Sequence, residues 1–332
     1  MFGLKRFFSS KSAKKTSQQY PYKPELLFNN GNKITDCATV SGRFSGRMLG
    51  VNSYVNAELS NFESSVLYDM GATMQDAEQL AKMLPRVPMV LPRLMQSIRA
   101  KETTAQDIAD LISQDAVLVA DVMRLTKSPF YKTRAKITSL QHAVVLLGRE
   151  GVQRLVASAI LKPLIGTRGG FFMEMSAKML WEHAEKTAQA AFRLSSSTEE
   201  TRFHAYLAAL LVNLGFTVGL KILDRNFDSS SSPHAEDFYL AFNRKCLELS
   251  ATIAQSWGMP SEIVAALKNF SNEKRQVNNE LEANLYVAYY LAQAEMLSDK
   301  LEFDIENLHI LLNQKPCVNC QKIMSILMEE DG

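Results

Sequence analysis

The segment AYLAALLVNLGFTVGLKIL, residues 205–223, is the most apolar stretch of the chain. It is interrupted at four positions, namely Asn213, Gly215, Gly219 and Lys221. Its uninterrupted part is therefore far shorter than the ~20 residues that a membrane span requires. We expect a single buried core helix, over residues 199–223, in a soluble protein.

Helical patterns continue on the N-terminal side of this core segment. Apolar residues over 108–122 recur at three- and four-residue spacings, which predicts one helix, and Thr104 with Asp107 gives its start a capping box. A later helix is expected to end at Gly148, because glycine suits the left-handed conformation that follows many helices. The next helix covers about residues 150–161.

The rest of the chain is also helical in pattern. A long helix is expected over residues 173–194, and another begins with Pro233 at its first helical position and closes at Trp257-Gly258. Shorter helices are expected around residues 262–270, 280–296, 304–312 and 321–328.

These patterns predict an all-α protein. No part of residues 74–332 alternates at period two and no heptad repeat persists, so we expect an irregular multi-helix bundle and not a coiled coil. The predicted organisation is a basic, disordered tail (1–19), a poorly ordered, extended lead-in (20–75), a helical domain (76–275) with a possible internal boundary near 166–172, and a C-terminal helical extension (276–332).

Charge gives little indication of a nucleic-acid partner. Over 332 residues the formal net charge is +2, and 22% of residues are charged. The first fifteen residues are an exception, because they hold five basic residues and no acid. We interpret this tail as solubilising, and weak attachment to an anionic membrane surface or to nucleic acid is the alternative.

The four cysteines are too few for a disulfide scaffold in a chain of this length, which favours a reducing compartment and a cytoplasmic protein. Cys317 and Cys320 form a lone C-x-x-C, a possible thiol pair for a metal or a redox reaction. It has no second pair at zinc-finger spacing and follows no βαβ pattern, so we expect two ordinary thiols and no cofactor.

The order of several short motifs resembles the HDOD domain. Leu84-Pro85-Arg86-Val87-Pro88 and Ser139-Leu140-Gln141-His142-Ala143 look like parts of its first half. Trp181 with His183, residues 203–215 and Trp257-Gly258-Met259-Pro260 look like parts of its second half. The family's Asp-Pro is replaced by Asp115-Ala116, and its Asn-Ser by Lys127-Ser128, which weakens the match locally.

The resemblance implies a fold related to HD-type metal phosphohydrolases, whose histidines and His-Asp pair hold divalent metals that generate a hydroxide. Here the His-Asp pair would fall at Val212-Asn213, a usual histidine is Cys246, and the closing His-His pair would fall at Phe270-Ser271. Valine and phenylalanine have no lone pair to donate to a metal. We therefore expect no catalytic residue, no metal site and no enzyme activity.

Some polar and aromatic residues of the implied cleft remain. A possible ligand cleft would be lined by Trp181, His183, His204, Asn213, Cys246 and Trp257. For the histidines the favoured interpretation is burial with hydrogen bonds to neighbouring groups, and for the tryptophans it is core packing.

Three functions follow from this pattern. The first is a non-catalytic output or scaffold module of a bacterial regulatory pathway, which contacts another signalling protein. The second is a sensor in which the old cleft holds a nucleotide, a cyclic dinucleotide or another small anionic ligand. The third is a residual metal-dependent phosphohydrolase that would have to assemble a new metal site.

Overall fold

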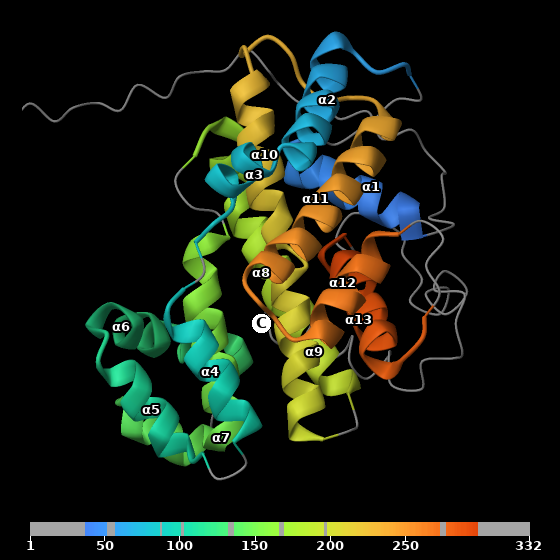
Figure 1. Cartoon of the computed structure of the whole chain (residues 1–332). Coiled ribbons are helices and arrows are strands. Elements are labelled where there is room, and N and C mark those ends of the chain that lie inside the picture. The colour runs from blue at the N-terminus through green and yellow to red at the C-terminus, as the bar shows by residue number, and fades with distance from the viewer. Residues whose placement is uncertain are drawn as a thin grey trace, which may run out of the picture.

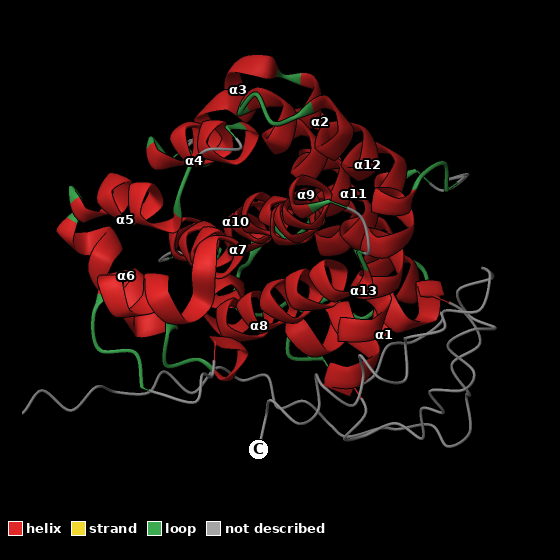
Figure 2. Ribbon diagram, turned by 90° about the horizontal axis from the view of Figure 1, so that it is seen from below, coloured by secondary structure: helices red, strands yellow, loops and turns green. Residues whose placement is uncertain are grey.

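The computed structural model describes residues 37–51, 57–86, 88–100, 103–131, 136–165, 169–195, 198–272 and 277–297. In this part of the chain the regular elements are helices, which confirms the all-α prediction (Figures 1 and 2). The α-helices are α1 (Cys37–Met48), α2 (Asn61–Gln75), α3 (Ala77–Met83), α4 (Val90–Arg99), α5 (Ala105–Ser113), α6 (Ala116–Leu125), α7 (Leu140–Leu161), α8 (Phe171–Leu194), α9 (Glu199–Leu211), α10 (Leu214–Asn226), α11 (Glu236–Ser256), α12 (Ser261–Ser271) and α13 (Glu280–Leu297), with 3-10 turns at Pro129–Tyr131 and Lys162–Leu164.

The helices form two neighbouring groups. Helices α4, α5 and α6 pack on α7 at one side of the molecule, and the remaining helices surround α9 and α10 (Figure 2). Buried apolar side chains from both groups, such as Leu161 of α7 and Leu207 of α9, belong to one hydrophobic cluster. Residues 166–168, at the boundary that the sequence suggested, lie outside the described residues.

The apolar segment is a buried core element. Residues Glu199–Asn226 are long and apolar enough to cross a membrane by composition, but 94% of the tested window is buried inside the bundle. A helix that is apolar on all sides and enclosed by other helices is typical of the core of a soluble domain.

The expected single helix over 199–223 is in fact two helices. The break falls at Val212 and Asn213, between α9 and α10. There the Ser250 hydroxyl of α11 accepts a hydrogen bond from Gly215 N (2.8 Å) and donates one to the Val212 carbonyl (2.7 Å). A Cβ on Gly215 would lie 1.8 Å from the Cys246 carbonyl oxygen, so only glycine permits this approach of α11.

The prediction of an extended lead-in over 20–75 is wrong for residues 37–48 and 61–75, which are helices α1 and α2. Val40, Phe44 and Met48 recur every four residues and are buried. The serines and glycines between them are poor helix formers, so the sequence pattern is weak, and burial of this apolar stripe stabilises the helix instead.

Three other predicted helix boundaries can be compared with the structure. The predicted helix over 108–122 is two helices, because Asp115 caps α6 by accepting hydrogen bonds from Val117 N and Leu118 N. Gly148 has a positive φ of 64°, as expected, but its ψ of −171° is not that of a left-handed helical cap, and α7 resumes directly after it. Pro233 is not at a first helical position, since α11 begins at Glu236.

The predicted C-terminal extension is partly integral to the bundle. Helix α13 packs against α8, α9, α12 and α1, and most of its residues are buried. The predicted tail over 1–19 and the predicted helices at 304–312 and 321–328 lie outside the described residues.

Glu63 shows how α2 is held to the body. Its fully buried carboxylate accepts hydrogen bonds from Ser60 N (2.8 Å), His234 N (2.7 Å) and Ala235 N (2.8 Å). Burial by itself would raise the pKa of Glu63, but the N–H groups of Ala235, His234 and Ser60 outweigh it, and the net pKa is lowered. The ionised carboxylate therefore joins the start of α2 to the segment before α11.

We expect Glu63→Gln to lower the free energy of unfolding by about 2 kcal/mol at neutral pH. The glutamine NH₂ group would face one of the buried backbone N–H groups, and two donors cannot form a hydrogen bond with each other. Since the folded-state pKa lies below the unfolded value near 4.5, the stability from ionised Glu63 is complete above that pH and is lost as the pH falls below it. Urea unfolding of wild type and Glu63→Gln should show that the difference in their free energies of unfolding becomes smaller at acidic pH. Asp107→Asn, in the exposed capping box of α5, is the control and should cost less.

Candidate functional site

At the position where the resemblance places the HD metal site lie a buried histidine and its neighbours. His183 of α8 is fully buried, and its Nδ1 lies 2.9 Å from the Asn213 side-chain amide at the α9–α10 break. Its Nε2 lies 3.2 Å from the carbonyl oxygen of Tyr289 in α13. Both ring nitrogens are therefore engaged within the protein.

Aromatic rings from four helices form a column through this position. The ring centre of His183 lies 4.6 Å from that of Phe44 in α1 and 4.7 Å from that of Tyr289, which it meets edge to face. Tyr289 in turn lies 5.0 Å from Phe270 of α12. Such edge-to-face packing is favourable and leaves no room between the rings. The side chains of α1, α12 and α13 fill the space in which a ligand would contact His183.

Burial decides the protonation of His183. Desolvation disfavours the imidazolium and lowers the pKa of His183 to about 4, despite hydrogen bonds that act in the opposite direction. A neutral imidazole has one N–H group only. Both contacts are satisfied if Nε2–H donates to the Tyr289 carbonyl and the NH₂ end of the Asn213 amide donates to Nδ1. The oxygen and nitrogen ends of an amide side chain are assigned from the hydrogen bonds around them, so the amide can be turned in this way.

The hydroxyl end of Tyr289 is also held by the protein. It accepts a hydrogen bond from Asn243 Nδ2 of α11 (3.3 Å), and the same Nδ2 lies 3.3 Å from the Ser45 hydroxyl of α1. Burial raises the pKa of Tyr289 above its ordinary value, so the phenol stays protonated. Asn243 thus connects α11 to both helices that close the site.

Cys246 lies near this network as a buried thiol. It is fully buried one helical turn after Asn243. Burial raises the pKa of the Cys246 thiol well above its ordinary value. With its thiol protonated, Cys246 packs as a small apolar side chain.

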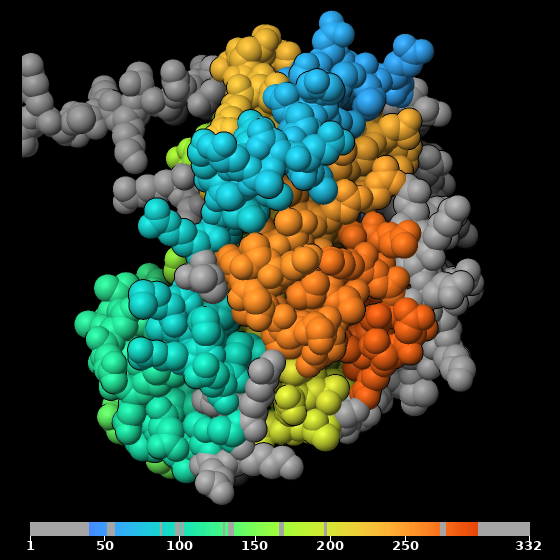
Figure 3. Space-filling model, viewed as in Figure 1, coloured from blue at the N-terminus to red at the C-terminus, as the bar shows by residue number. Residues whose placement is uncertain are grey.

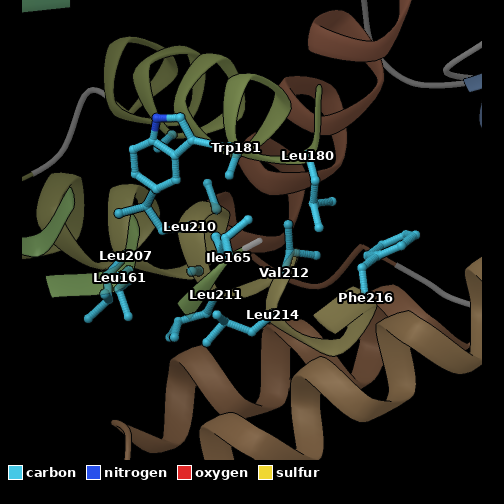
Figure 4. Packing of buried hydrophobic residues seen from close by; sticks show 14 of the residues in the cluster. Leu161, Ile165, Leu180, Trp181, Leu207, Leu210, Leu211, Val212, Leu214 and Phe216 are labelled. Carbon is cyan, nitrogen blue, oxygen red and sulfur yellow. The ribbon is translucent and has the colours of Figure 1, made fainter. Parts of the chain in front are cut away.

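The other replaced positions contribute to packing or to a helix end. Val212 is 1% exposed and points toward Leu180 within the apolar cluster (Figure 4). Phe270 is 3% exposed and packs on Tyr289. The Ser271 hydroxyl donates to the Lys268 carbonyl at 2.9 Å, at the exposed end of α12.

The six residues of the predicted ligand cleft do not share one site. His183 and Asn213 meet, and Cys246 lies close by. Trp181 is two positions from His183 on α8 and so faces away from it. The Trp181 ring lies 5.1 Å from the Lys162 ammonium instead.

His204 and Trp257 also lie elsewhere. His204 precedes Asn213 by nine residues, ~13 Å along a helix, and its Nδ1 lies 3.1 Å from the Glu262 carboxylate of α12. Trp257 Nε1 donates to the Pro85 carbonyl at 3.0 Å and fixes the end of α11 to the segment before α4. The prediction of one common cleft is therefore wrong for Trp181, His204 and Trp257.

The described residues do not fit the metal that the HD fold implies. No group of three or more His, Cys, Asp or Glu side chains among them could hold a metal ion. At the old site the donors are a neutral imidazole with both nitrogens engaged, an amide and a protonated thiol. The predicted thiol pair Cys317 and Cys320 lies outside the described residues.

Sequence reasoning did not identify Phe44, Asn243 or Tyr289 as members of the site. Phe44 lies in a segment that the sequence suggested was extended, and Tyr289 lies beyond the predicted domain. The buried YVAYY run of α13, residues 286–290, was a usable signal, because a helix that is apolar on every side must be enclosed by other elements.

The buried histidine predicts a dependence of stability on pH. Between its folded pKa near 4 and its unfolded value near 6.5, the unfolded chain binds a proton that the folded chain does not, so stability falls as the pH decreases. We expect His183 to account for a loss of about 2 kcal/mol between about pH 7.5 and about pH 5. Urea unfolding of His183→Gln should lack this part of the loss, whereas His142→Gln, at the start of α7, should keep it. If the free energy of unfolding depends on pH equally steeply in wild type and His183→Gln, the assignment to His183 is contradicted.

The aromatic column predicts the effect of removing one ring. Phe44→Ala should lower the free energy of unfolding by about 3–5 kcal/mol, because a fully buried phenyl group leaves a cavity. Water entering that cavity should raise the pKa of His183 toward its ordinary value, as measured by NMR titration of the imidazole. Tyr68→Ala, which removes an aromatic ring that is 76% exposed, should change neither quantity appreciably.

Comparisons with known proteins agree with this fold. The HDOD domain family matches residues 84–272, more than half of the chain. An HDOD domain protein of unknown function from Geobacter sulfurreducens superposes with a TM-score of 0.55 at 20% identity, over 81% of this chain and 94% of that one. A proposed metal-dependent phosphohydrolase from Shewanella amazonensis gives 0.54 at 15% identity, over 81% of this chain and all of that one.

Two further relatives have longer chains. A proposed signal transduction protein from Marinobacter aquaeolei gives a TM-score of 0.53 at 17% identity, over 90% of this chain and 65% of that one. An uncharacterized protein from Treponema pallidum is 26% identical over 199 residues, which are 57% of this chain and only 38% of that protein. The family match, together with the order of its motifs and the helical bundle, shows that this chain belongs to the HDOD domain family.

Proposed function

We propose that this HDOD domain is a non-catalytic signalling module that acts through contacts with another signalling protein. The observation that carries the proposal is the aromatic column through the position of the HD metal site, in which Phe44 and Tyr289 pack on both sides of His183. A hydrolytic site needs open coordination positions and water at the metal. Packed rings offer neither.

The chemistry of the replaced positions supports the same function. Val212 and Phe270 have no lone pair to donate, and both are buried in apolar surroundings. Asn213 offers a neutral amide that is already bonded to His183. A divalent metal would have to displace these contacts and charge the site, at a large cost in desolvation.

The comparisons fit a role in signalling at a coarse level. The HDOD domain and the resemblance in fold to a proposed signal transduction protein are compatible with such a role. We propose further that the protein is bacterial and cytoplasmic, since the matched proteins named above come from bacteria and the apolar core helices are buried within the bundle. The input signal would reach the partner through the surface and not through catalytic turnover.

The sensor hypothesis is less well supported by the geometry. A nucleotide at the old cleft would require the rings of Phe44 and Tyr289 to move away from His183, and with them parts of α1 and α13. The loss of this packing would have to be offset by contacts with the ligand. We therefore place the functional surface outside the old cleft.

Metal analysis and an activity panel on the purified full chain test the proposal. We expect no stoichiometric metal after exposure to Mn²⁺, Fe²⁺ or Zn²⁺, and no turnover of nucleotides, cyclic dinucleotides or phosphate monoesters. An active HD phosphohydrolase serves as the positive control under the same conditions. Tightly bound metal together with phosphodiesterase turnover that is lost in His183→Gln would overturn the proposal.

A further inference from the structure

The surface holds an apolar cleft where the two groups of helices meet. Its volume is about 170 Å³, and it lies between α4 and the turn that joins α11 to α12 (Figure 3 shows the side of the molecule on which these elements meet). The cleft is lined by Pro92, Met95, Gln96, Trp257, Gly258, Met259 and Pro260. A volume of this size suits one ring or one branched aliphatic side chain, since an engineered cavity of ~150 Å³ in another protein accepts benzene.

The walls of the cleft are fixed in place. The Trp257 indole N–H is bonded to the Pro85 carbonyl at 3.0 Å, so the ring has no polar group left to satisfy. Gly258 has a φ of 67°, the left-handed conformation that ends α11 and turns the chain toward Pro260. Methionine side chains beside such a ring adapt to different apolar groups. The cleft is therefore formed before any partner binds.

Two exposed arginines lie next in sequence to residues at the cleft. Arg86 follows Pro85, whose carbonyl accepts the hydrogen bond from Trp257, and Arg93 follows Pro92, which lines the cleft. Both arginines are exposed. Among the described residues neither guanidinium forms an ion pair with an acid. The Glu262 carboxylate, two residues after Pro260, is 50% exposed, and its Oε1 lies 3.1 Å from His204 Nδ1.

An exposed apolar side chain lies directly before α4, the helix that forms one wall of the cleft. Met89, directly before α4, is 86% exposed, more than the other large apolar side chains in the described ranges. An apolar side chain in such a position is typical of an interaction surface when it borders a cleft with charged neighbours.

We propose that this cleft is a docking site for an acidic peptide segment of a partner protein, with one large apolar side chain of the peptide inserted against Trp257 and Met259. The proposal rests on the proposed function, because it names the surface and the partner chemistry through which a non-catalytic HDOD domain would act. Carboxylates that flank the anchor residue would face Arg86 and Arg93 and set the orientation of the peptide.

Charge complementarity selects this occupant over others. A basic peptide would meet two unpaired guanidinium groups. A nucleic acid would match the arginines but has no aliphatic side chain for the cleft. A peptide that combines glutamates with leucine, methionine or phenylalanine matches both the apolar floor and the two arginines.

Fluorescence anisotropy of labelled peptides with the full wild-type chain tests the proposal. The probes are short synthetic peptides with glutamates on both sides of a single leucine, methionine or phenylalanine. Matched peptides have alanine in place of the apolar residue or lysine in place of the glutamates, and an oligonucleotide of the same length tests binding by charge alone. We expect the acidic apolar peptides to bind, and their affinity to fall as the salt concentration rises.

Charge reversal locates the binding site. Arg86→Glu with Arg93→Glu should weaken binding about tenfold, as expected for the loss of two exposed charge pairs. Arg124→Glu with Lys127→Glu makes the same change in net charge at the exposed end of α6 and should leave binding unchanged. In Trp181→Phe, Trp257 is the remaining tryptophan, and its emission should shift when an acidic apolar peptide binds.

Three results would overturn the docking proposal: no binding by any acidic apolar peptide, equal binding by the alanine peptides or the oligonucleotide, or equal weakening by both charge reversals. Such a result would leave the proposed function standing as long as the chain binds no metal and turns over no phosphate ester. The two proposals can therefore fail separately.

Discussion

The burial of a neutral imidazole at His183 is the constraint around which the bundle is organised. A charged imidazolium has no compensating carboxylate at this position, so the ring must stay neutral and its two nitrogens must find partners within the protein. Those partners come from distant parts of the chain, the α9–α10 break and α13. The rings of Phe44 and Tyr289 complete the enclosure, so α1, α8 and α13 cannot be displaced independently.

Under the proposed function, the same constraint explains how an HD-type fold persists without a metal. In a phosphohydrolase, ions hold the facing helices together through their ligands. Here the link is made by uncharged contacts: His183 to Asn213 and Tyr289, Asn243 to Tyr289 and Ser45, and Ser250 to the helix break. Most buried polar groups in this chain of contacts have a partner, which keeps the cost of burying them low; the exception is one end of the Asn213 amide, which has none among the described residues.

The sequence determined the helical class, the HDOD motif order and which residues stand at the implied metal-ligand positions. These features depend on residue type and local spacing alone: apolar periodicity, capping residues such as Thr104 and Asp107, and the presence of valine or phenylalanine where a lone pair is required. The positive φ of Gly148 could be predicted for the same reason, because it is a local property of the backbone.

Only the tertiary structure decided which distant residues meet. Nothing local shows that Gly215 must lack a Cβ so that α11 can approach, or that Asn213 ends a helix instead of continuing it. The helix at Val40, Phe44 and Met48 is weak in sequence and forms because its stripe is buried against other helices. The old site is filled by Phe44 and Tyr289, about 245 positions apart, and their proximity comes from long-range packing, which no local pattern encodes.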